Sequence, residues 1–233
     1  MENLSSTPAE NIIKDDFIDN RYGWEIVDSD KETAILTSDG YQLNNKDKDR
    51  WHHFSLFPDL TSLKGIAIKC KLEIESDSGV GQVGLIWGFD TKMSQLNRFC
   101  LSAAGKGCSI IHFERNHRPV FHRFYDPFID IGTLSQTAVL EVREANGYWF
   151  FRVNQQLVYI AHEIHFAAKG AGIGFYLDPG VRVRIKKLRV ARRPSSKAFS
   201  SNWWDSLSLC VVLLGSPLCS EAPWRECCFL TRV

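Results

Sequence analysis

The chain has 233 residues, of which 44% are hydrophobic and 24% are charged, and its formal net charge is +1. This composition is that of a globular protein and excludes a chain that is disordered throughout. A nearly neutral charge lacks the broad positive field that binding to a phosphate backbone requires, so we expect no nucleic-acid partner. Aromatic residues make up 12% of the chain, and two packed sheets bury such rings well.

Residues 1–10 have neither a basic segment nor an apolar core, so they do not look like a secretory signal, and we expect a flexible N-terminus. Of the seven cysteines, only Cys70, Cys100 and Cys108 precede residue 191. Their spacing suggests neither a disulfide framework nor a zinc site. We therefore expect reduced thiols, a cytoplasmic location and no cofactor. Calcium stays open, because its ligands would be oxygens scattered over loops.

The residues that follow alternate in the way that strands do. In Ile66–Ile74 the apolar side chains point one way and the charged ones the other, which predicts a half-buried strand. Gly81–Phe89 is almost continuously apolar, which predicts a central strand covered on both faces. The other strands are predicted at Asn97–Ser102, Cys108–Arg115, Val120–Tyr125, Thr137–Glu144, Tyr148–Val153, Leu157–Ala161, Gly172–Leu177 and Val181–Val190.

About a dozen strands with short turns predict an all-β fold, and only Glu163–Lys169 is a candidate for a short helix. We therefore predict a two-sheet antiparallel β-sandwich, or jelly roll, over residues 11–190. Residues 191–233 show no alternation, and the apolar run Leu207–Leu214 is much shorter than the ~20 residues that span a bilayer. We expect a poorly ordered tail there and no transmembrane segment. The alternative is a tail helix docked on the domain or on a membrane.

Gly79–Gly84 matches the G-x-G-x-x-G fingerprint of dinucleotide sites. That fingerprint works only where its glycines open a helix that faces the pyrophosphate. Here the glycines lead into the apolar strand, so we interpret them as residues that permit a turn and close packing of the sheet.

Several segments resemble known sequences. The run Asp15–Trp24 is similar to the start of LamG-type bacterial domains in the concanavalin A-like lectin/glucanase superfamily. Further similar segments follow in the same order, at Gly40–Leu43, Gly84–Asp90, Asn97–Ser102, Val153–Val158 and Gly172–Tyr176. The resemblance implies a jelly roll whose first and last strands are neighbours, with a concave face that often holds glycans. The superfamily includes lectins, glucanases and modules that only contact protein, so the fold does not select among these functions.

Aromatic side chains are the best candidates for a binding surface, because the C–H faces of sugars stack on rings. Tyr148 and Phe150 share one face of their predicted strand, while Trp149 and Phe151 share the other, and one of these faces must be core. The alternative is that loops cover the remaining rings. The candidate ligand-binding residues are Trp51, Trp87, Arg98, Tyr148, Phe150 and Tyr176.

Catalysis would need paired carboxylates. Glu73, Glu75 and Asp77 stand two residues apart and so fall on one face of a strand. A retaining glycosidase pair needs carboxyl groups roughly 5–5.5 Å apart. However, Lys69 and Lys71 share that face, and mixed charges are typical of a solvated surface. We therefore predict no catalytic residue.

Histidines and basic residues are also more easily explained as surface groups. The helical zinc motif needs a second histidine four residues after the first, but His165 follows His162 by three. If Asn116-His117 forms a two-residue turn, His112 and His122 fall on opposite faces, so we predict no metal site. The final strand carries a basic stripe that either discourages edge pairing or meets an acidic partner. Its residues are Arg182, Arg184, Lys186, Lys187, Arg189, Arg192 and Arg193.

The sequence thus favours a recognition module without catalytic activity, whose concave sheet binds carbohydrate or a glycosylated ligand. The first alternative is an intracellular protein-interaction or scaffold domain. The second is a glycoside hydrolase.

Overall fold

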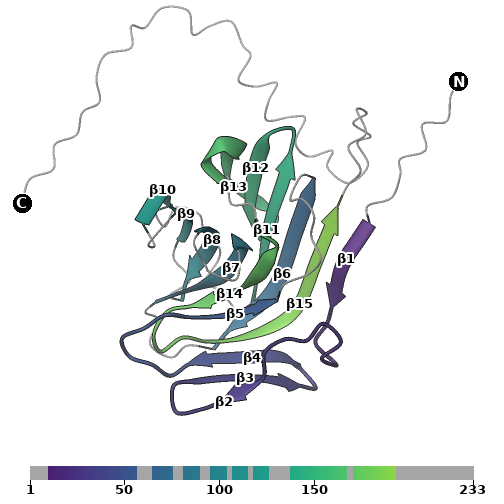
Figure 1. Ribbon diagram of the computed structural model, residues 1–233, viewed down its shortest axis with the longest axis vertical. Helices are drawn as coiled ribbons and strands as arrows, with labels where there is room; N and C mark the ends of the chain where they lie inside the picture. The colour runs from purple at the N-terminus through teal and green to yellow at the C-terminus, as the bar shows by residue number, and fades with distance from the viewer. Residues whose placement is uncertain are drawn as a thin grey trace, which may run out of the picture. The chain divides into compact units, whose positions relative to one another are not determined.

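The computed structural model places its described residues in one compact unit, Thr7–Ser195. Two antiparallel sheets pack against each other in this unit and confirm the predicted all-β sandwich (Figure 1). The tail predicted from residue 191 lies outside the described residues from 193 onward. The described residues are 10–56, 65–75, 81–89, 95–103, 107–114, 118–125, 137–166 and 170–192.

The larger sheet has nine strands, and its first and last strands, β1 and β15, are paired as the resemblance implies. β15 lies at its centre, since it also pairs with β6 and with β4. The order across the sheet is β13 (Gln156–His162), β12 (Tyr148–Val153), β11 (Thr137–Ala145), β6 (Ile66–Ile74), β15 (Arg182–Arg192), β4 (Gly40–Asn45), β3 (Glu32–Thr37) and β2 (Val27–Asp28), with β1 (Glu10–Asp15) beside β15.

The smaller sheet has six strands and carries most of the candidate site. Its order is β10 (Arg118–Tyr125), β9 (Cys108–Glu114), β8 (Gln95–Ser102), β7 (Gln82–Phe89), β14 (Gly172–Leu177) and β5 (His52–Leu56). The predicted short helix is a 3-10 turn, Glu163–Phe166, directly after β13. The described residues contain no helix that is long and apolar enough to cross a membrane.

Strand alternation produces the core. In β6, Ile66, Ile68, Cys70 and Leu72 are fully buried, while Lys69 and Lys71 are exposed. β7 differs, because nearly all of its residues are buried on both faces, as its continuous apolar sequence predicts. Burying a large apolar side chain stabilises the fold by roughly 1.5–3 kcal/mol. The period-two pattern therefore fixes which face of each sheet turns inward.

Two hairpins follow each other along β11, β12 and β13. The first turns at Asn146-Gly147, where φ is 54° and 78°, as the two-residue hairpin signal predicts. The second turns at Asn154-Gln155, with φ of 48° and 73°. Gln155 therefore holds a left-handed conformation that costs a residue with a Cβ about 1–2 kcal/mol. Part of this cost is offset by the Asn154 side chain, whose Oδ1 accepts a hydrogen bond of 2.8 Å from the Val139 amide.

The run Asp15–Trp24, similar to an opening strand in other proteins, is mostly a turn here, because β1 ends at Asp15. Phe17 has a φ of 60°, which no strand accommodates. The Asp15 carboxylate accepts hydrogen bonds from the Phe17 amide at 2.8 Å and from Trp24 Nε1 at 2.7 Å. Asn20 bonds both the amide and the carbonyl of Trp24, at 2.7 and 2.9 Å. These polar residues hold the turn and have a structural role.

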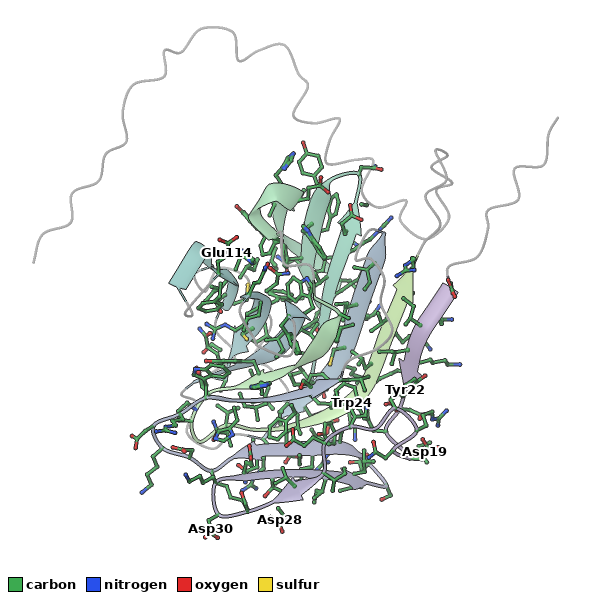
Figure 2. The ribbon with its side chains drawn as sticks, viewed as in Figure 1. Asp19, Tyr22, Trp24, Asp28, Asp30 and Glu114 are labelled. Atoms are coloured by element: carbon green, nitrogen blue, oxygen red, sulfur yellow. The ribbon has the colours of Figure 1, made fainter. Side chains whose placement is uncertain are left out.

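The turn delivers two rings into the core. Phe17 and Trp24 pack with Tyr41 and Phe175, with ring centroids 5.3–6.4 Å apart. Figure 2 shows Trp24 in the loop beside β1, together with Tyr22. Because Phe175 belongs to the smaller sheet and Tyr41 to the larger, this cluster joins the two sheets at one end of the sandwich.

Candidate functional site

The outer face of the six-stranded sheet is unusually apolar. A second cluster of buried side chains lies there, separate from the main core. Its members are Ile86, Phe89, Leu96, Cys100 and Tyr176, with Phe113 packed against them. An outer sheet face normally carries polar residues, so this face needs another explanation.

Glycines shape the middle of this face. Gly84 on β7 lies opposite Tyr176 on β14, and Gly174 on β14 lies opposite Ile86. A Cβ at Gly84 would stand 2.1 Å from the carbonyl oxygen of Phe99, and one at Gly174 would stand 2.3 Å from that of Phe54. The strands approach too closely here for any side chain, as expected for strand glycines. No side chain fills the face at these two positions.

A small, open pocket with a cavity volume of about 50 Å³ lies on this face. Strand register brings its lining together: Ile86 pairs with Arg98 across β7 and β8, and Leu96 pairs with Phe113 across β8 and β9. The lining residues are Trp51, Ile86, Leu96, Arg98, Phe113 and Tyr176.

Trp51, which precedes β5, forms the exposed wall of the pocket. Its indole stacks on Tyr176, with centroids 5.6 Å apart and planes at 30°, and 39% of the residue is exposed. The imidazole of His53 lies 5.8 Å from the same indole. Burial lowers the pKa of His53 below its usual 6.5, so His53 is neutral at pH 7. The wall is therefore aromatic and uncharged.

Arg98 is the cation of this pocket. Its guanidinium carbon lies 4.2 Å from the ring centroid of Tyr176 and 5.3 Å from that of Phe113. These distances are typical of cation–π contacts. Arg98 makes no ion pair with any described residue, and its buried Nε has no hydrogen-bond partner.

Tyr176 is fixed by a polar contact at its far end. Its hydroxyl donates a hydrogen bond of 2.5 Å to Oδ1 of Asp178. Burial raises the pKa of Tyr176 well above its usual range, so its hydroxyl stays protonated at physiological pH and donates this hydrogen bond. Tyr176 thus serves as a rigid, preoriented floor for both Trp51 and Arg98.

The structure brings three of the six predicted ligand-binding residues together, namely Trp51, Arg98 and Tyr176. Trp87 does not join them, because it is fully buried between the sheets, 5.7 Å from Trp149 and 6.1 Å from Phe151. Trp87 lies on the same face of β7 as Val83 and Leu85, which also point into the core. The expectation that Trp87 lies on a sheet surface is therefore wrong.

Tyr148 and Phe150 lie on the outer face of the nine-stranded sheet, since their neighbours Trp149 and Phe151 are buried in the core. Tyr148 is 45% exposed and packs edge-on against His162, 5.2 Å away. The predicted separation of the two faces of β12 is confirmed. Ligand binding by Tyr148 and Phe150 stays a prediction.

Sequence reasoning missed the apolar lining of the pocket, Ile86, Leu96 and Phe113. Leu96 precedes the predicted start of its strand, since β8 begins at Gln95 and not at Asn97. Leu96 and Arg98 stand two residues apart, so they fall on the same face of a strand. This spacing is the signal that would have placed Leu96 beside the candidate residue Arg98.

The carboxylates Glu73 and Glu75 are held by basic residues of β15, far from any acid–base arrangement. Arg184 contacts Glu75 at 2.5 Å, Glu73 at 3.7 Å and Asp39 at 2.7 Å. Lys186 contacts Glu73 at 3.6 Å and also binds Asp39. We refer to these five residues as the charged ladder. Asp77, the third predicted carboxylate, lies outside the described residues.

A hydrogen bond from Lys186 and the nearby Arg184 hold the pKa of Asp39 below its usual 3.8. Asp39 is therefore ionised at neutral pH, beside the two cations of the ladder. Arg184 and Lys186 belong to the basic stripe expected from the sequence, so this part of the stripe already has acidic partners within the chain.

The described residues contain no group of three His, Cys, Asp or Glu side chains that could hold a metal ion. In the β9–β10 register, His112 pairs with Phe121 and His122 with Ile111, so the two histidine positions do not face each other. His112 instead bonds Asn97 at 2.7 Å and lies 3.4 Å from the exposed Glu114, which Figure 2 shows beside β9.

Cys70, Cys100 and Cys108 are free and buried. Cys108 pairs with Leu101, one residue after Cys100, so the two thiols of this hairpin fall on opposite faces. Burial raises the pKa of both Cys100 and Cys108 to about 12. These cysteines act as small apolar residues, as predicted, because a protonated thiol is a poor nucleophile.

No family model matches the sequence, and no curated protein matches it significantly. Solved structures do match its fold. The carbohydrate-binding module CBM66 from Bacillus subtilis has a TM-score of 0.53 and 15% identity, over 74% of this chain and 97% of that one. A Bacillus subtilis protein of unknown function with a galectin-like fold has a TM-score of 0.56 and 11% identity, over 81% and 100%.

The catalytic domain of an endo-1,3-β-glucanase (laminarinase) from Thermotoga petrophila is also similar, with a TM-score of 0.58 and 8% identity, over 81% of this chain and 99% of that one. Binding modules and glucanases thus share this architecture with the present chain. The likeness identifies the fold, and the residues of the site must decide the function.

Proposed function

We propose that this concanavalin A-like sandwich is a carbohydrate-binding module without catalytic activity, and that it takes its saccharide in the pocket formed by Trp51, Arg98 and Tyr176. The observation that carries the proposal is the aromatic wall beside a cation on the outer face of the six-stranded sheet. Fold neighbours named as a carbohydrate-binding module and as glucanases support the same ligand class.

The chemistry of the pocket suits a sugar ring. One side of a pyranose or furanose presents C–H groups, which pack on an aromatic face such as that of Trp51. Hydroxyl groups at the ring edge need polar partners, and the Arg98 guanidinium offers donors at the bottom of the pocket. Apolar walls with a few convergent polar groups are typical of small-ligand sites.

A hydrolase would need two carboxylates that flank the bound sugar. Among the described residues of this face, Asp178 is the carboxylate next to the pocket wall, and its Oδ1 is bonded to Tyr176. Glu73 and Glu75 lie on the other sheet, within the charged ladder. These placements favour binding without hydrolysis. If the chain releases reducing sugar from a glycan, and substitution of Glu73 or Glu75 abolishes this release, the protein is a glycoside hydrolase instead.

A protein-interaction role would use the basic stripe of β15. Because Arg184 and Lys186 are already paired within the chain, an acidic partner would have to use the exposed members of the stripe, such as Arg182 and Arg189, which lie on an open surface and do not line the pocket. This arrangement favours the saccharide proposal. The cytoplasmic location expected from the sequence stays a prediction, and the three free cysteines are compatible with it.

The test uses isothermal titration calorimetry on the full chain with soluble β-1,3-glucan, mixed-linkage glucan and pectin fragments. We expect Trp51→Ala to weaken binding of whichever glycan binds the wild-type chain by about tenfold or more, because the substitution removes the aromatic wall. Tyr148→Ala is the matched control, since its ring is similarly exposed, at 45% against 39%, on the opposite sheet. We expect its affinity to be unchanged.

Two outcomes contradict the proposal. The first is that no saccharide in the panel binds to the wild-type chain. The second is that binding survives Trp51→Ala and is lost in Tyr148→Ala, which would move the site to the nine-stranded sheet.

A further inference from the structure

We infer that the pocket is specific for acidic saccharides, and that Arg98 binds the carboxylate of a uronic acid residue. This inference rests on the proposed function and names the ligand class of the same site. The observation behind it is a guanidinium that lines a pocket, lies on two aromatic rings and has no counter-ion among the described residues.

Arg98 differs from the cations of the charged ladder because no described carboxylate lies within 4.0 Å of it. It differs from exposed cations that also lack such a partner, for example Lys71 and Arg189, because it lines a pocket. Arg184 has three carboxylate contacts within 4.0 Å, and Lys186 and Lys46 are also paired with acids. Arg98 has none, and its Nε is buried without a hydrogen-bond acceptor. A buried donor without a partner costs about 1–3 kcal/mol. An acceptor that reaches the guanidinium from the pocket would add a hydrogen bond that the described residues do not supply.

No carboxylate of the described residues contacts the Arg98 guanidinium. Ile86, Leu96 and Phe113 surround it with apolar surface. Asp178, the acid beside the pocket wall, uses Oδ1 to accept the hydrogen bond of Tyr176. The two aromatic contacts stabilise the cation only partly, by roughly 0.5–2 kcal/mol for a cation–π contact. They also hold the guanidinium in one orientation.

A carboxylate matches this cation better than a hydroxyl group does. The guanidinium presents its donors as a planar fork, and a carboxylate accepts two parallel hydrogen bonds from it. Charge-assisted bonds of this kind are about twice as strong as neutral ones. The apolar walls exclude water and strengthen the attraction further. A uronic acid carries such a carboxylate on a sugar ring that can pack against Trp51.

The size of the pocket limits the bound portion. A cavity volume of about 50 Å³ is well below the roughly 300–1,000 Å³ of pockets that enclose a whole small ligand. The pocket therefore holds one substituent of a sugar residue, such as its carboxylate, while the ring lies against the exposed wall. Free uronic acid and the terminal residue of a uronic acid polymer present the same chemistry to Arg98.

The experiment compares tri-galacturonic acid with its fully methyl-esterified form by calorimetry on the full chain, and repeats the pair with glucuronic and mannuronic acid oligomers. Free monosaccharides form a separate arm that distinguishes a free acid from a polymer end. Esterification removes the charge and keeps the ring, so it isolates the contribution of the carboxylate. We expect at least one acid to bind about tenfold or more tightly than its ester.

Variants then assign the preference to Arg98. We expect Arg98→Gln to remove the preference for the acid and to change ester binding less than about threefold. Arg98→Lys keeps the charge, loses the fork, and should give an intermediate preference. Arg184→Gln is the matched control, because it removes the same charge from the other sheet and should leave the preference unchanged.

The two proposals fail in different ways. If the wild-type chain binds neutral glycans or esters as well as acids, the acidic specificity is overturned and the saccharide module stands. If the acid preference persists in Arg98→Gln, the role of Arg98 is overturned. If neither acids nor neutral glycans bind, the proposed function fails together with this inference.

Discussion

The outer faces of the two sheets differ in whether their arginines Arg184 and Arg98 are paired with carboxylates. On the nine-stranded sheet, the charged ladder pairs every one of its cations with carboxylates from β6 and from Asp39. On the six-stranded sheet, Arg98 lies among apolar and aromatic side chains, and no carboxylate in the described part of the chain pairs with it. Both faces lie on strands of one sandwich, so the difference comes from their side chains.

This contrast separates a surface that is complete from one that needs a ligand. In the charged ladder each cation contacts at least two carboxylates of the same chain, so neither cation needs a ligand as its counter-ion. A lone guanidinium beside a pocket keeps most of its capacity for hydrogen bonds. Three predictions test this difference, in order of decreasing effect.

Gly84→Ala should have the largest effect, because it tests the close approach of β7 and β8 on the six-stranded sheet. The new methyl group would lie 2.1 Å from the Phe99 carbonyl oxygen, so β7 and β8 would have to separate. We expect the free energy of unfolding to fall by about 3 kcal/mol or more. Chemical denaturation monitored by tryptophan fluorescence measures it.

Gly180→Ala provides the comparison for this variant. Gly180 has a φ of 72° and open space around its Cβ position, so only backbone strain of about 1–2 kcal/mol is expected. Equal losses in the two variants would mean that the strands do not approach as closely as described.

Replacing the arginine on each face should change the free energy of unfolding by different amounts. Arg184→Met leaves Glu73 and Glu75, which are 26% and 22% exposed, without their shared partner. After allowance for solvent screening, we expect a loss of about 1 kcal/mol that shrinks in high salt. Arg98→Met should change stability by less than about 0.5 kcal/mol, because the variant loses two cation–π contacts but also removes a buried Nε that has no hydrogen-bond partner.

Urea denaturation of both variants at low and high salt checks this prediction. A larger loss for Arg98→Met than for Arg184→Met would show that Arg98 has a structural partner, and the contrast between the faces would disappear.

The two faces should also lose stability in different pH ranges, which is the smallest expected effect. Burial lowers the pKa of His53 below 6.5, so the unfolded chain binds a proton before the folded chain does. Stability therefore falls as the pH drops below about 6.5. The pKa of Asp39 lies below 3.8, so its contribution is present above pH 3.8 and is lost as the pH falls through its folded value.

Thermal unfolding as a function of pH measures both ranges. His53→Gln should flatten the upper range, and Asp39→Asn should flatten only the lower one. Some slope should persist in His53→Gln, because burial also lowers the pKa of His112. A wild-type curve that is flat between pH 7 and 5 would contradict the buried, neutral state of His53.

The sequence predicts the sandwich well because its strands alternate. Ile66–Ile74, Tyr148–Val153 and Gly172–Leu177 have the predicted bounds, since each has turn residues or a change of period at its ends. The turn Asp15–Trp24 could not be predicted, because nothing in its composition signals a left-handed Phe17.

The site is only partly predictable, for a related reason. Trp87 and Ile86 belong to a strand that is apolar on both faces, so alternation cannot say which of them faces the core. The pairing of Leu96 with Phe113 depends on register between strands that are distant in sequence. Aromatic content could suggest Trp51 and Tyr176 as candidates, but only long-range packing brings them to the same pocket.

The most direct test of the saccharide site is an NMR titration of the ¹⁵N-labelled full chain with the glycan that binds best by calorimetry. We predict that the largest shift changes fall on the Trp51 indole, the Arg98 Nε–H and the amide of Tyr176, and that Tyr148 does not shift. Changes that gather around Tyr148 on the nine-stranded sheet would contradict the account.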